Sequence, residues 1–286
     1  MKISTYYIAL MSMILSMLSY QTSASFAKKL ILELDALSVT LFRLVFATIL
    51  VCIMFRSWRI IRQFSQVSWQ DAVLYSFSMG LMNLLFYMSL AKIPLGIAVG
   101  LEFVGPLSLA LLAIQQRRDY IWVVLAIVGI VTLVPWQQHH DFSVVGALLA
   151  LAAGVCWALY IHFGQKVVKQ NIGVHALTLG IGLSALTLLP IGLWYDAPTL
   201  LNPSYWGSAF MLALLATAFP YALDLYALKY LNKMSYGTLT SLSPAFAALS
   251  GWVLLHEYLS WLQLTGIACI VVASIGVSVF RVKNEQ

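Results

Sequence analysis

The sequence predicts an all-α polytopic membrane protein, with ten transmembrane helices arranged as two inverted five-helix repeats. The first observation is composition, since 62% of the 286 residues are hydrophobic and 9% are charged, against about 25% charged residues in typical soluble proteins. The second is a succession of apolar stretches of about 20 residues, each long enough for a helix to cross a bilayer. The third is an internal repeat. These stretches leave no room for a soluble domain.

The apolar stretches end at charged residues, turns and tryptophans, and these limits define the spans in chain order. The predicted spans are 5–27, 36–55, 69–90, 94–114, 120–136, 143–163, 173–194, 205–229, 234–255 and 259–280. Stretches such as Val123–Val134 and Ile267–Phe280 are apolar on every face, which predicts helices and excludes the alternating strands of an outer-membrane barrel. Lys2 and the apolar run after it resemble a signal peptide, but no cleavage-site pattern precedes Lys28, so we expect a retained first helix.

The orientation follows from the loop cations, because Lys and Arg are retained on the cytoplasmic side. With the N-terminus inside, the cytoplasmic loops carry Lys2, Arg56, Arg59, Arg62, Arg117, Arg118, Lys166, Lys169, Lys229, Lys233, Arg281 and Lys283. The opposite loops carry only Lys28, Lys29 and Lys92. An even number of spans returns the chain to its starting side, so both termini of this multi-pass protein are expected in the cytoplasm.

The chain matches itself at a nearly constant shift of about 137 residues. The matched residues include Tyr20 with Trp157, Pro106 with Pro244, and Gly129 with Gly266. The first repeat is assigned to residues 1–141 and the second to residues 142–286. Each repeat contains an odd number of spans, so the two copies enter the membrane in opposite directions, which is the inverted-repeat design of secondary transporters with a substrate site near the midplane.

Three ionisable residues lie well inside the predicted spans: Arg43, Glu102 and Asp224. A charge at the bilayer centre costs at least about 2.5–3.5 kcal/mol on insertion scales, so such residues usually face a bundle interior or a water-filled cavity. At a rise of about 1.5 Å per residue, Arg43 and Glu102 lie at the same depth. They are candidates for a substrate or proton site, and the alternative is an intramembrane ion pair that joins helices. Asp224 is close to Lys229, and its alternative is contact with water at the cytoplasmic end.

Other polar and aromatic residues inside the spans are candidates for lining the same cavity. Asn83 and Tyr87 can supply hydrogen-bond donors and acceptors, with simple interhelical bonding as the alternative. Trp157 and Trp252 lie inside their spans and not at the interface, so they either line the cavity or pack in the core. We treat Asn83, Tyr87, Trp157 and Trp252 as candidate substrate-binding residues together with Arg43 and Glu102.

Two symmetry-related prolines are expected to break their helices near the middle of the membrane. Pro106 cannot donate to the carbonyl of Glu102, and Pro244 cannot donate to that of Thr240. Both are candidate hinge residues beside the cavity. Gly96–Gly100 permits close approach of a neighbouring helix or a ligand, and a GxxxG packing face is the alternative reading of this pair.

Motifs for cofactors, metals and nucleotides are missing from the sequence. Cys52, Cys156 and Cys269 lie singly in apolar segments, and the HEYLS segment at 256–260 lacks the second His of a zinc protease. We therefore expect no metal and no cofactor. No nucleic-acid partner is expected either, since the basic residues are scattered among span ends.

The energy source follows by elimination. Without a nucleotide motif, uphill transport needs an ion gradient. Burial favours the neutral form of a carboxylate, so Glu102, and after it Asp224, are candidates for proton coupling.

The amino-acid sequences of several segments also resemble those of a known family. PLGIAVGLEFVGPLSLAL, GVCWALYIHFGQ and YGTLTSLSPAFAALSGWVLLHEYLS resemble EamA-type members of the drug/metabolite transporter superfamily, and among them bacterial exporters of threonine and homoserine. The resemblance implies a ten-helix exporter of small amino acids in the bacterial inner membrane, driven by the proton-motive force. A monomer and a homodimer are both left open by the sequence. Exporters of aromatic amino acids, other metabolites or drugs share similar helices. Asp224 stands where the exporters lead us to expect Glu, which leaves the substrate open.

The paired charges suggest how an amino acid could be held. A zwitterion has two separated charges, and a site with one cation and one anion at equal depth matches it. We expect Arg43 to meet the α-carboxylate and Glu102 the α-ammonium. Between substrates the two residues could pair with each other. Two alternatives belong to different classes of protein. One is an intramembrane enzyme, and the other is a channel or structural protein.

Overall fold

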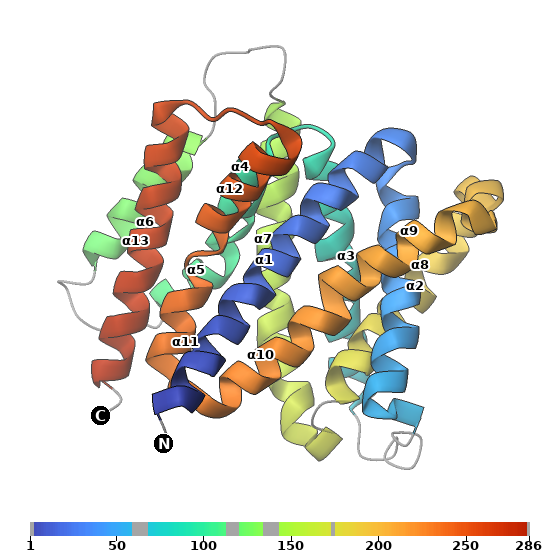
Figure 1. Ribbon diagram of the computed structural model, residues 1–286, viewed down its shortest axis with the longest axis horizontal. Helices are drawn as coiled ribbons and strands as arrows, with labels where there is room; N and C mark the ends of the chain where they lie inside the picture. The colour runs from blue at the N-terminus through green and yellow to red at the C-terminus, as the bar shows by residue number, and fades with distance from the viewer. Residues whose placement is uncertain (1–2, 59–67, 113–119, 134–142, 173–174, 285–286) are drawn as a thin grey trace.

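The computed structural model describes residues 3–58, 68–112, 120–133, 143–172 and 175–284, and within these ranges it contains helices, turns and no β-strand (Figure 1). The first half of the chain forms α1 (Ile3–Glu33), α2 (Ala36–Phe55), α3 (Trp69–Leu90), α4 (Leu95–Glu102), α5 (Val104–Leu112) and α6 (Tyr120–Leu133). The second half forms α7 (Val144–Val167), η3 (Val168–Ile172), α8 (His175–Leu200), η4 (Pro203–Tyr205), α9 (Trp206–Ala213), η5 (Leu214–Ala218), α10 (Phe219–Tyr230), α11 (Lys233–Thr240), α12 (Ser243–Leu255) and α13 (Trp261–Asn284).

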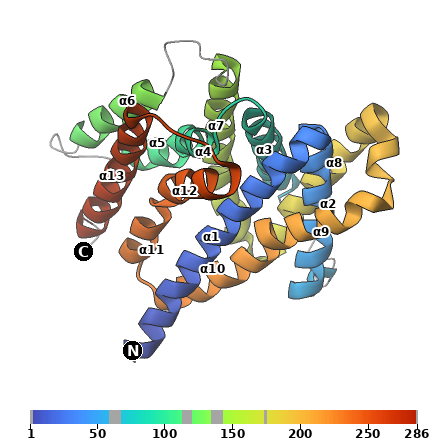
Figure 2. The same ribbon diagram turned by 45° about the horizontal axis from the view of Figure 1, so that its top comes forward.

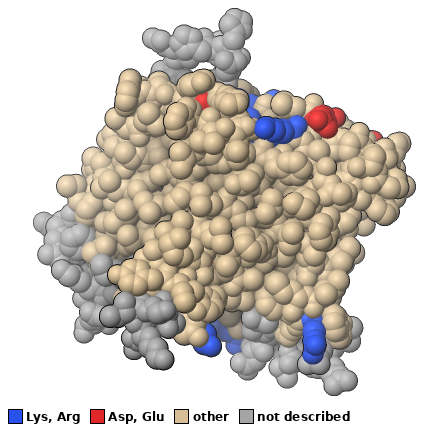
Figure 3. All heavy atoms as spheres, viewed as in Figure 1, with Lys and Arg blue, Asp and Glu red and all other residues tan. Residues whose placement is uncertain are grey.

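Eight helical stretches in the described residues are long and apolar enough to cross a membrane. Two further helices coincide with predicted spans: α1 is a continuous helix of 31 residues whose apolar sequence contains several serines, and α6 has 14 described residues. The face seen in Figure 3 is a broad band without Lys, Arg, Asp or Glu, and the charged residues in view gather toward its two ends. A belt without charged residues between charged ends is the surface expected of a protein surrounded by lipid.

The two predicted spans that contain the candidate hinge prolines are each built from two helices. The α4–α5 pair is interrupted at Phe103, directly after Glu102, and the α11–α12 pair at Ser241 and Leu242. Both interruptions lie just before a proline, at Pro106 and at Pro244, because proline cannot donate to the carbonyl four residues earlier. The chain therefore changes direction beside Glu102.

The beginning of α1 and the end of α13 lie at the same end of the bundle, here called the terminal end (Figure 1). The turns between α3 and α4 and between α12 and α13 lie at the other end, here called the opposite end. Helices far apart in sequence pack in pairs: α1 runs beside α10, α3 beside α7, α2 beside α8 and α6 beside α13 (Figures 1 and 2).

Close helix contacts depend on residues without large side chains. A Cβ atom at Gly105 or Gly154 would overlap the backbone of the other chain segment, so the α4–α5 break rests directly on α7. Gly96 faces Ala248 of α12, and Gly100 faces Leu133 of α6. Gly96 and Gly100 thus serve helix packing, as the alternative interpretation of this pair expects.

Candidate functional site: a charged cavity in the helical bundle

A cavity of about 440 Å³ lies inside the bundle, between α1, α2, α3, α4, α7, α8, α10, α11 and the η5 turn. Five of the six residues predicted to contact substrate line it: Arg43, Asn83, Tyr87, Glu102 and Trp157. Asp224 lines it as well. Trp252, the sixth, does not line the cavity, and its side chain is 55% exposed on α12. Pro106 and Pro244 also lie outside the lining.

Arg43 is held by two neutral acceptors. Its Nη1 donates to the hydroxyl of Tyr87 over 3.2 Å, and its Nη2 donates to the carbonyl of Ala216 over 3.4 Å. The guanidinium carbon also lies 5.6 Å from the centre of the Tyr87 ring, within the range of a cation–π interaction. These contacts orient the guanidinium, and no carboxylate in the described part of the chain forms an ion pair with it.

Glu102 is the last residue of α4, where the helix breaks, and its side chain is buried. No side chain in the described part of the chain forms an ion pair with it, and none donates a hydrogen bond to it. The alternative in which Arg43 and Glu102 pair only with each other is therefore not the arrangement found in this conformation.

The neighbouring residues are arranged by simple local contacts. Asn83 Nδ2 donates to the carbonyl of Met79 over 2.8 Å, which fixes the amide and leaves its oxygen as an acceptor. Trp157 packs edge-to-face against Phe103, with ring centres 5.7 Å apart. Through this contact Trp157 supports the α4–α5 break from the side of α7.

The cavity also has a lining that the sequence analysis did not single out. It extends toward the terminal end along α1, α7, α10 and α11, with Ser16, Tyr20, Tyr160, Tyr221 and Tyr236 among its polar side chains. A signal for it exists in the sequence, because the lining positions of α1 and α10 recur every three or four residues, as one face of a helix does. Polar groups on a single helical face inside an apolar span mark that face as inward.

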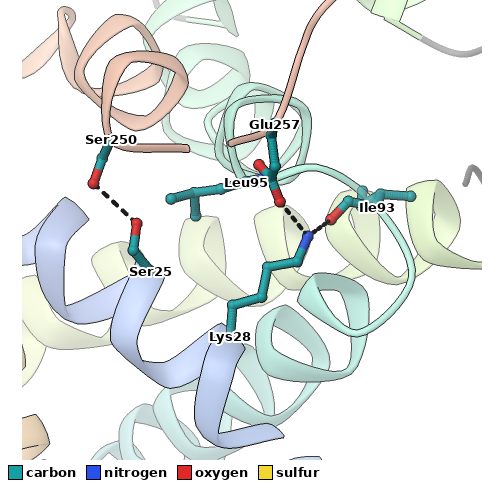
Figure 4. A network of polar contacts seen from close by, with 6 residues as sticks. All are labelled: Ser25, Lys28, Ile93, Leu95, Ser250 and Glu257. Carbon is teal, nitrogen blue, oxygen red and sulfur yellow. Dashed lines mark hydrogen bonds and ion pairs between the residues drawn. The ribbon is translucent and has the colours of Figure 1, made fainter. Parts of the chain in front are cut away.

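A polar network ties three segments together at the opposite end (Figure 4). Lys28 Nζ lies 2.6 Å from Glu257 Oε1 and donates to the carbonyl of Ile93 over 2.6 Å. The second oxygen of Glu257 accepts from Leu95 N over 2.7 Å. The side chains of Lys28 and Glu257 are 19% and 14% exposed. A hydroxyl pair, Ser25 and Ser250, adds a 2.9 Å contact between α1 and α12.

The turn after α12 places Glu257 in this network. His256 adopts the left-handed conformation, with φ 55°, and ends α12. Glu257 N then donates back to the carbonyl of Gly251 over 3.1 Å. A Cβ atom at Gly251 would come within 2.7 Å of Glu257 Oε2, so a glycine at this position makes room for the carboxylate.

The network lies beyond the cavity on each segment that contributes to both. On α1 the lining ends at Ala24 and the network begins at Ser25. On α4 the lining includes Val99 and Glu102, and the network uses Leu95. None of the network residues lines the cavity. The charged cavity therefore reaches toward the terminal end, and the network closes the bundle at the opposite end.

Comparison with known proteins gives the class of protein. The EamA-like transporter family matches residues 144–279. The threonine/homoserine exporter RhtA of Escherichia coli K12 is 38% identical over 283 residues, which cover 98% of this chain and 94% of that protein. RhtA of Salmonella typhimurium LT2 is also 38% identical, with the same coverage. The chain is thus a multi-pass membrane transporter. It belongs to the EamA-like transporter family.

The fold is also found in a solved structure. A chain described as "Crystal structure of protein" superposes with a TM-score of 0.61, over 98% of this chain and 99% of the other, at 14% sequence identity. This likeness extends to the whole helical arrangement. The names of the relatives favour transport over the alternative of an intramembrane enzyme.

Proposed function

We propose that this protein exports small amino acids of the threonine and homoserine type across the bacterial inner membrane, by proton-coupled alternating access. The relatives named as threonine/homoserine exporters support the substrate class. The observation that carries the proposal is that Arg43 and Glu102 line one cavity and are not paired with each other. A cation and an anion facing the same cavity complement a zwitterion.

In this proposal, Arg43 binds the α-carboxylate and Glu102 accepts hydrogen bonds from the α-ammonium. The guanidinium offers a planar set of donors, which matches a carboxylate through two parallel bonds. The Asn83 oxygen is available to accept from a side-chain hydroxyl, because its NH2 group is bonded to Met79. Threonine and homoserine both carry such a hydroxyl.

The helix contacts support two inverted repeats of five spans, with α1 and α6 completing a total of ten. Exchanging the two halves of the chain converts the α1–α10 contact into the α7–α3 contact, and both are present. Gly129 and Gly266, matched by the internal shift, also face each other: a Cβ at Gly129 would meet the carbonyl of Gly266 at 2.9 Å, and the reverse distance is 3.0 Å. Equivalent residues meet each other at a two-fold axis, here placed in the membrane plane.

Alternating access is supported by the difference between the two ends. With both termini in the cytoplasm, the cavity reaches toward the cytoplasmic side, and the network of Lys28 and Glu257 closes the outer side. Release of substrate outside then requires this network to separate. The breaks near Pro106 and Pro244 are the proposed hinges. The α4–α5 pair begins at Leu95, which belongs to the network, and the α11–α12 pair ends at Leu255, just before Glu257.

Proton coupling is assigned first to Glu102 and second to Asp224. Glu102 is buried at the break of α4, while Asp224 is on α10 in the part of the cavity nearer the terminal end. Burial disfavours a charged carboxylate, and an ammonium ion or a proton can each neutralise it. Exchange of one for the other at Glu102 would couple proton entry to amino-acid export.

An exporter of aromatic amino acids, other metabolites or drugs of the same superfamily is the second candidate. The observation in its favour is the aromatic lining, which includes Trp157, Tyr160 and Tyr221. Flat aromatic side chains stack well on such rings. This alternative uses the same cavity and differs in the ligand.

Counterflow into proteoliposomes tests the proposal with labelled threonine, homoserine, phenylalanine, a nucleobase and a cationic dye. We expect saturable uptake of threonine and homoserine that Arg43→Gln strongly reduces. Trp252→Phe is the matched control, because Trp252 lies outside the cavity. A preference for phenylalanine or the dye over threonine would support the second candidate, and conversion of substrate into a new compound would support an enzyme.

A further inference from the structure

The π-helical turn between α9 and α10 contains a proline that removes backbone hydrogen bonds beside the cavity. Phe219 N donates to the carbonyl of Leu214, five residues earlier, in the π-helical pattern. Pro220 has no N–H to donate. The carbonyls of Leu215 and Ala216, which are five and four residues before Pro220, therefore receive no bond from it. A buried carbonyl without a partner is costly, so each needs a donor from elsewhere.

Side chains of two other helices supply these donors. Ser19 Oγ of α1 donates to the carbonyl of Leu215 over 2.7 Å. Arg43 Nη2 of α2 donates to the carbonyl of Ala216 over 3.4 Å. The missing N–H of Pro220 thus explains why Arg43 meets a backbone carbonyl inside the membrane.

Resting on the proposed function, we propose that Pro220 is a positioning residue for recognition of the substrate carboxylate, because the Ala216 carbonyl that it frees orients Arg43. The carbonyl and the Tyr87 hydroxyl are neutral, so they orient the guanidinium without cancelling its charge. An acidic partner in their place would compete with the substrate carboxylate. Arginine has five N–H donors, and the donors left over face a cavity wide enough for an amino acid.

Pro220→Ala tests this role, because it restores an N–H that can bond to the Ala216 carbonyl within the helix. Binding of threonine and of threoninamide, whose carboxylate is replaced by a neutral amide, is measured calorimetrically on the purified full-length protein. We expect the preference for threonine over threoninamide to fall about two- to tenfold, the range for loss of one hydrogen bond. Pro220→Ser supplies the same N–H with a different side chain and is measured in parallel.

Two controls separate positioning from general damage to the helix. Pro190→Ala removes a proline from α8 at an exposed site outside the cavity. Ser19→Ala removes the donor to the other freed carbonyl. Both should leave the preference for threonine over threoninamide unchanged. In an Arg43→Gln background, Pro220→Ala should also leave this preference unchanged, because the two residues act through one contact.

The outcomes that contradict the inference are distinct from those that contradict the proposed function. An unaltered preference in folded Pro220→Ala, or an equal fall in the Arg43→Gln background, would overturn the role of Pro220 alone. If the unsubstituted protein bound neither threonine nor homoserine, the proposed function would fail, and the role of Pro220 in carboxylate recognition would fail with it.

Discussion

Lys28 of α1 and Glu257, in the segment that joins α12 to α13, form an ion pair with 2.6 Å between Nζ and Oε1. Each partner also bonds the backbone at the start of α4, through the carbonyl of Ile93 and the N–H of Leu95. Three chain segments thus share one mostly buried contact. Because each charged group satisfies both a side chain and a backbone group, separating any one segment breaks several bonds together.

The first prediction is that Lys28→Ala shifts the protein toward a conformation open at the network end. Removing the cation leaves Glu257 without its charge partner, which destabilises the closed arrangement. In a variant without the native cysteines, Val99→Cys places a thiol in the cavity lining. Its labelling by a membrane-impermeant reagent added outside should rise several-fold with Lys28→Ala.

Lys29→Ala is the matched control, because the adjacent lysine is exposed and forms no ion pair among the described residues. A labelling rate in Lys28→Ala equal to that of this control would show that the ion pair does not hold the end closed. Exchange of the charges, Lys28→Glu with Glu257→Lys, should restore closure only in part. A lysine at position 257 cannot accept from Leu95 N.

The second prediction is that Arg43→Lys weakens threonine binding about tenfold or more in folded protein. A lysine keeps the charge but loses the planar pair of donors, and one bond to a charged group contributes about 1.5–3 kcal/mol. Binding is measured by calorimetry, and folding by thermal unfolding of the purified protein. If Arg43 served only to join helices, the unfolding temperature would fall while affinity for threonine stayed unchanged.

The sequence predicted the helical fold well because its main signals are local. Within the described residues each predicted span overlaps one or more helices, and eight helical stretches are long and apolar enough to cross a membrane, because apolar length is a local property of the sequence. The same reasoning placed a charged pair at equal depth, and Arg43 and Glu102 do line one cavity. The expectation for Trp252 came from depth alone, which does not tell which side of a helix faces inward. That side depends on rotation about the helix axis.

Other features depend on contacts between distant segments and had no local signal. The partners of Lys28 come from residues far along the chain, at Ile93 and Glu257. The Ala216 carbonyl became an acceptor for Arg43 through a π-helical turn and Pro220 together. A proline could be read from the sequence, but the side chain that replaces its missing donor is determined by tertiary packing.

The third prediction concerns the crossing of the α4–α5 break with α7. A Cβ added at Gly105 would overlap the carbonyl of Gly154, so Gly105→Ala must push the two segments apart. Overpacking of this kind costs about 1–3 kcal/mol, and the unfolding temperature should fall. Gly207→Ala in α9 is the control, because nothing lies within 4 Å of the added Cβ and alanine favours the helix. Equal unfolding temperatures for the two variants would contradict the crossing.

The fourth prediction is that Glu102→Gln flattens the pH dependence of export. A glutamine keeps the shape of the side chain and one acceptor oxygen but cannot take up or release a proton. In the proposed cycle, a lower pH outside favours protonation at Glu102 when the cavity faces outward, which releases the α-ammonium and speeds export. Flux in proteoliposomes should therefore rise with an inward proton gradient in the unsubstituted protein and respond much less in Glu102→Gln.

The carboxylate nearer the terminal end provides the comparison for this prediction. Asp224 lines the same cavity from α10, so Asp224→Asn removes a second titratable group without touching α4. If Glu102 alone carries the coupled proton, Asp224→Asn keeps the pH response and changes only the rate of entry into the cavity. A normal pH response in folded Glu102→Gln, together with its loss in Asp224→Asn, would transfer the coupling role to Asp224. The Glu102 carboxylate would then bind only the substrate ammonium, and threonine affinity in Glu102→Gln should still fall.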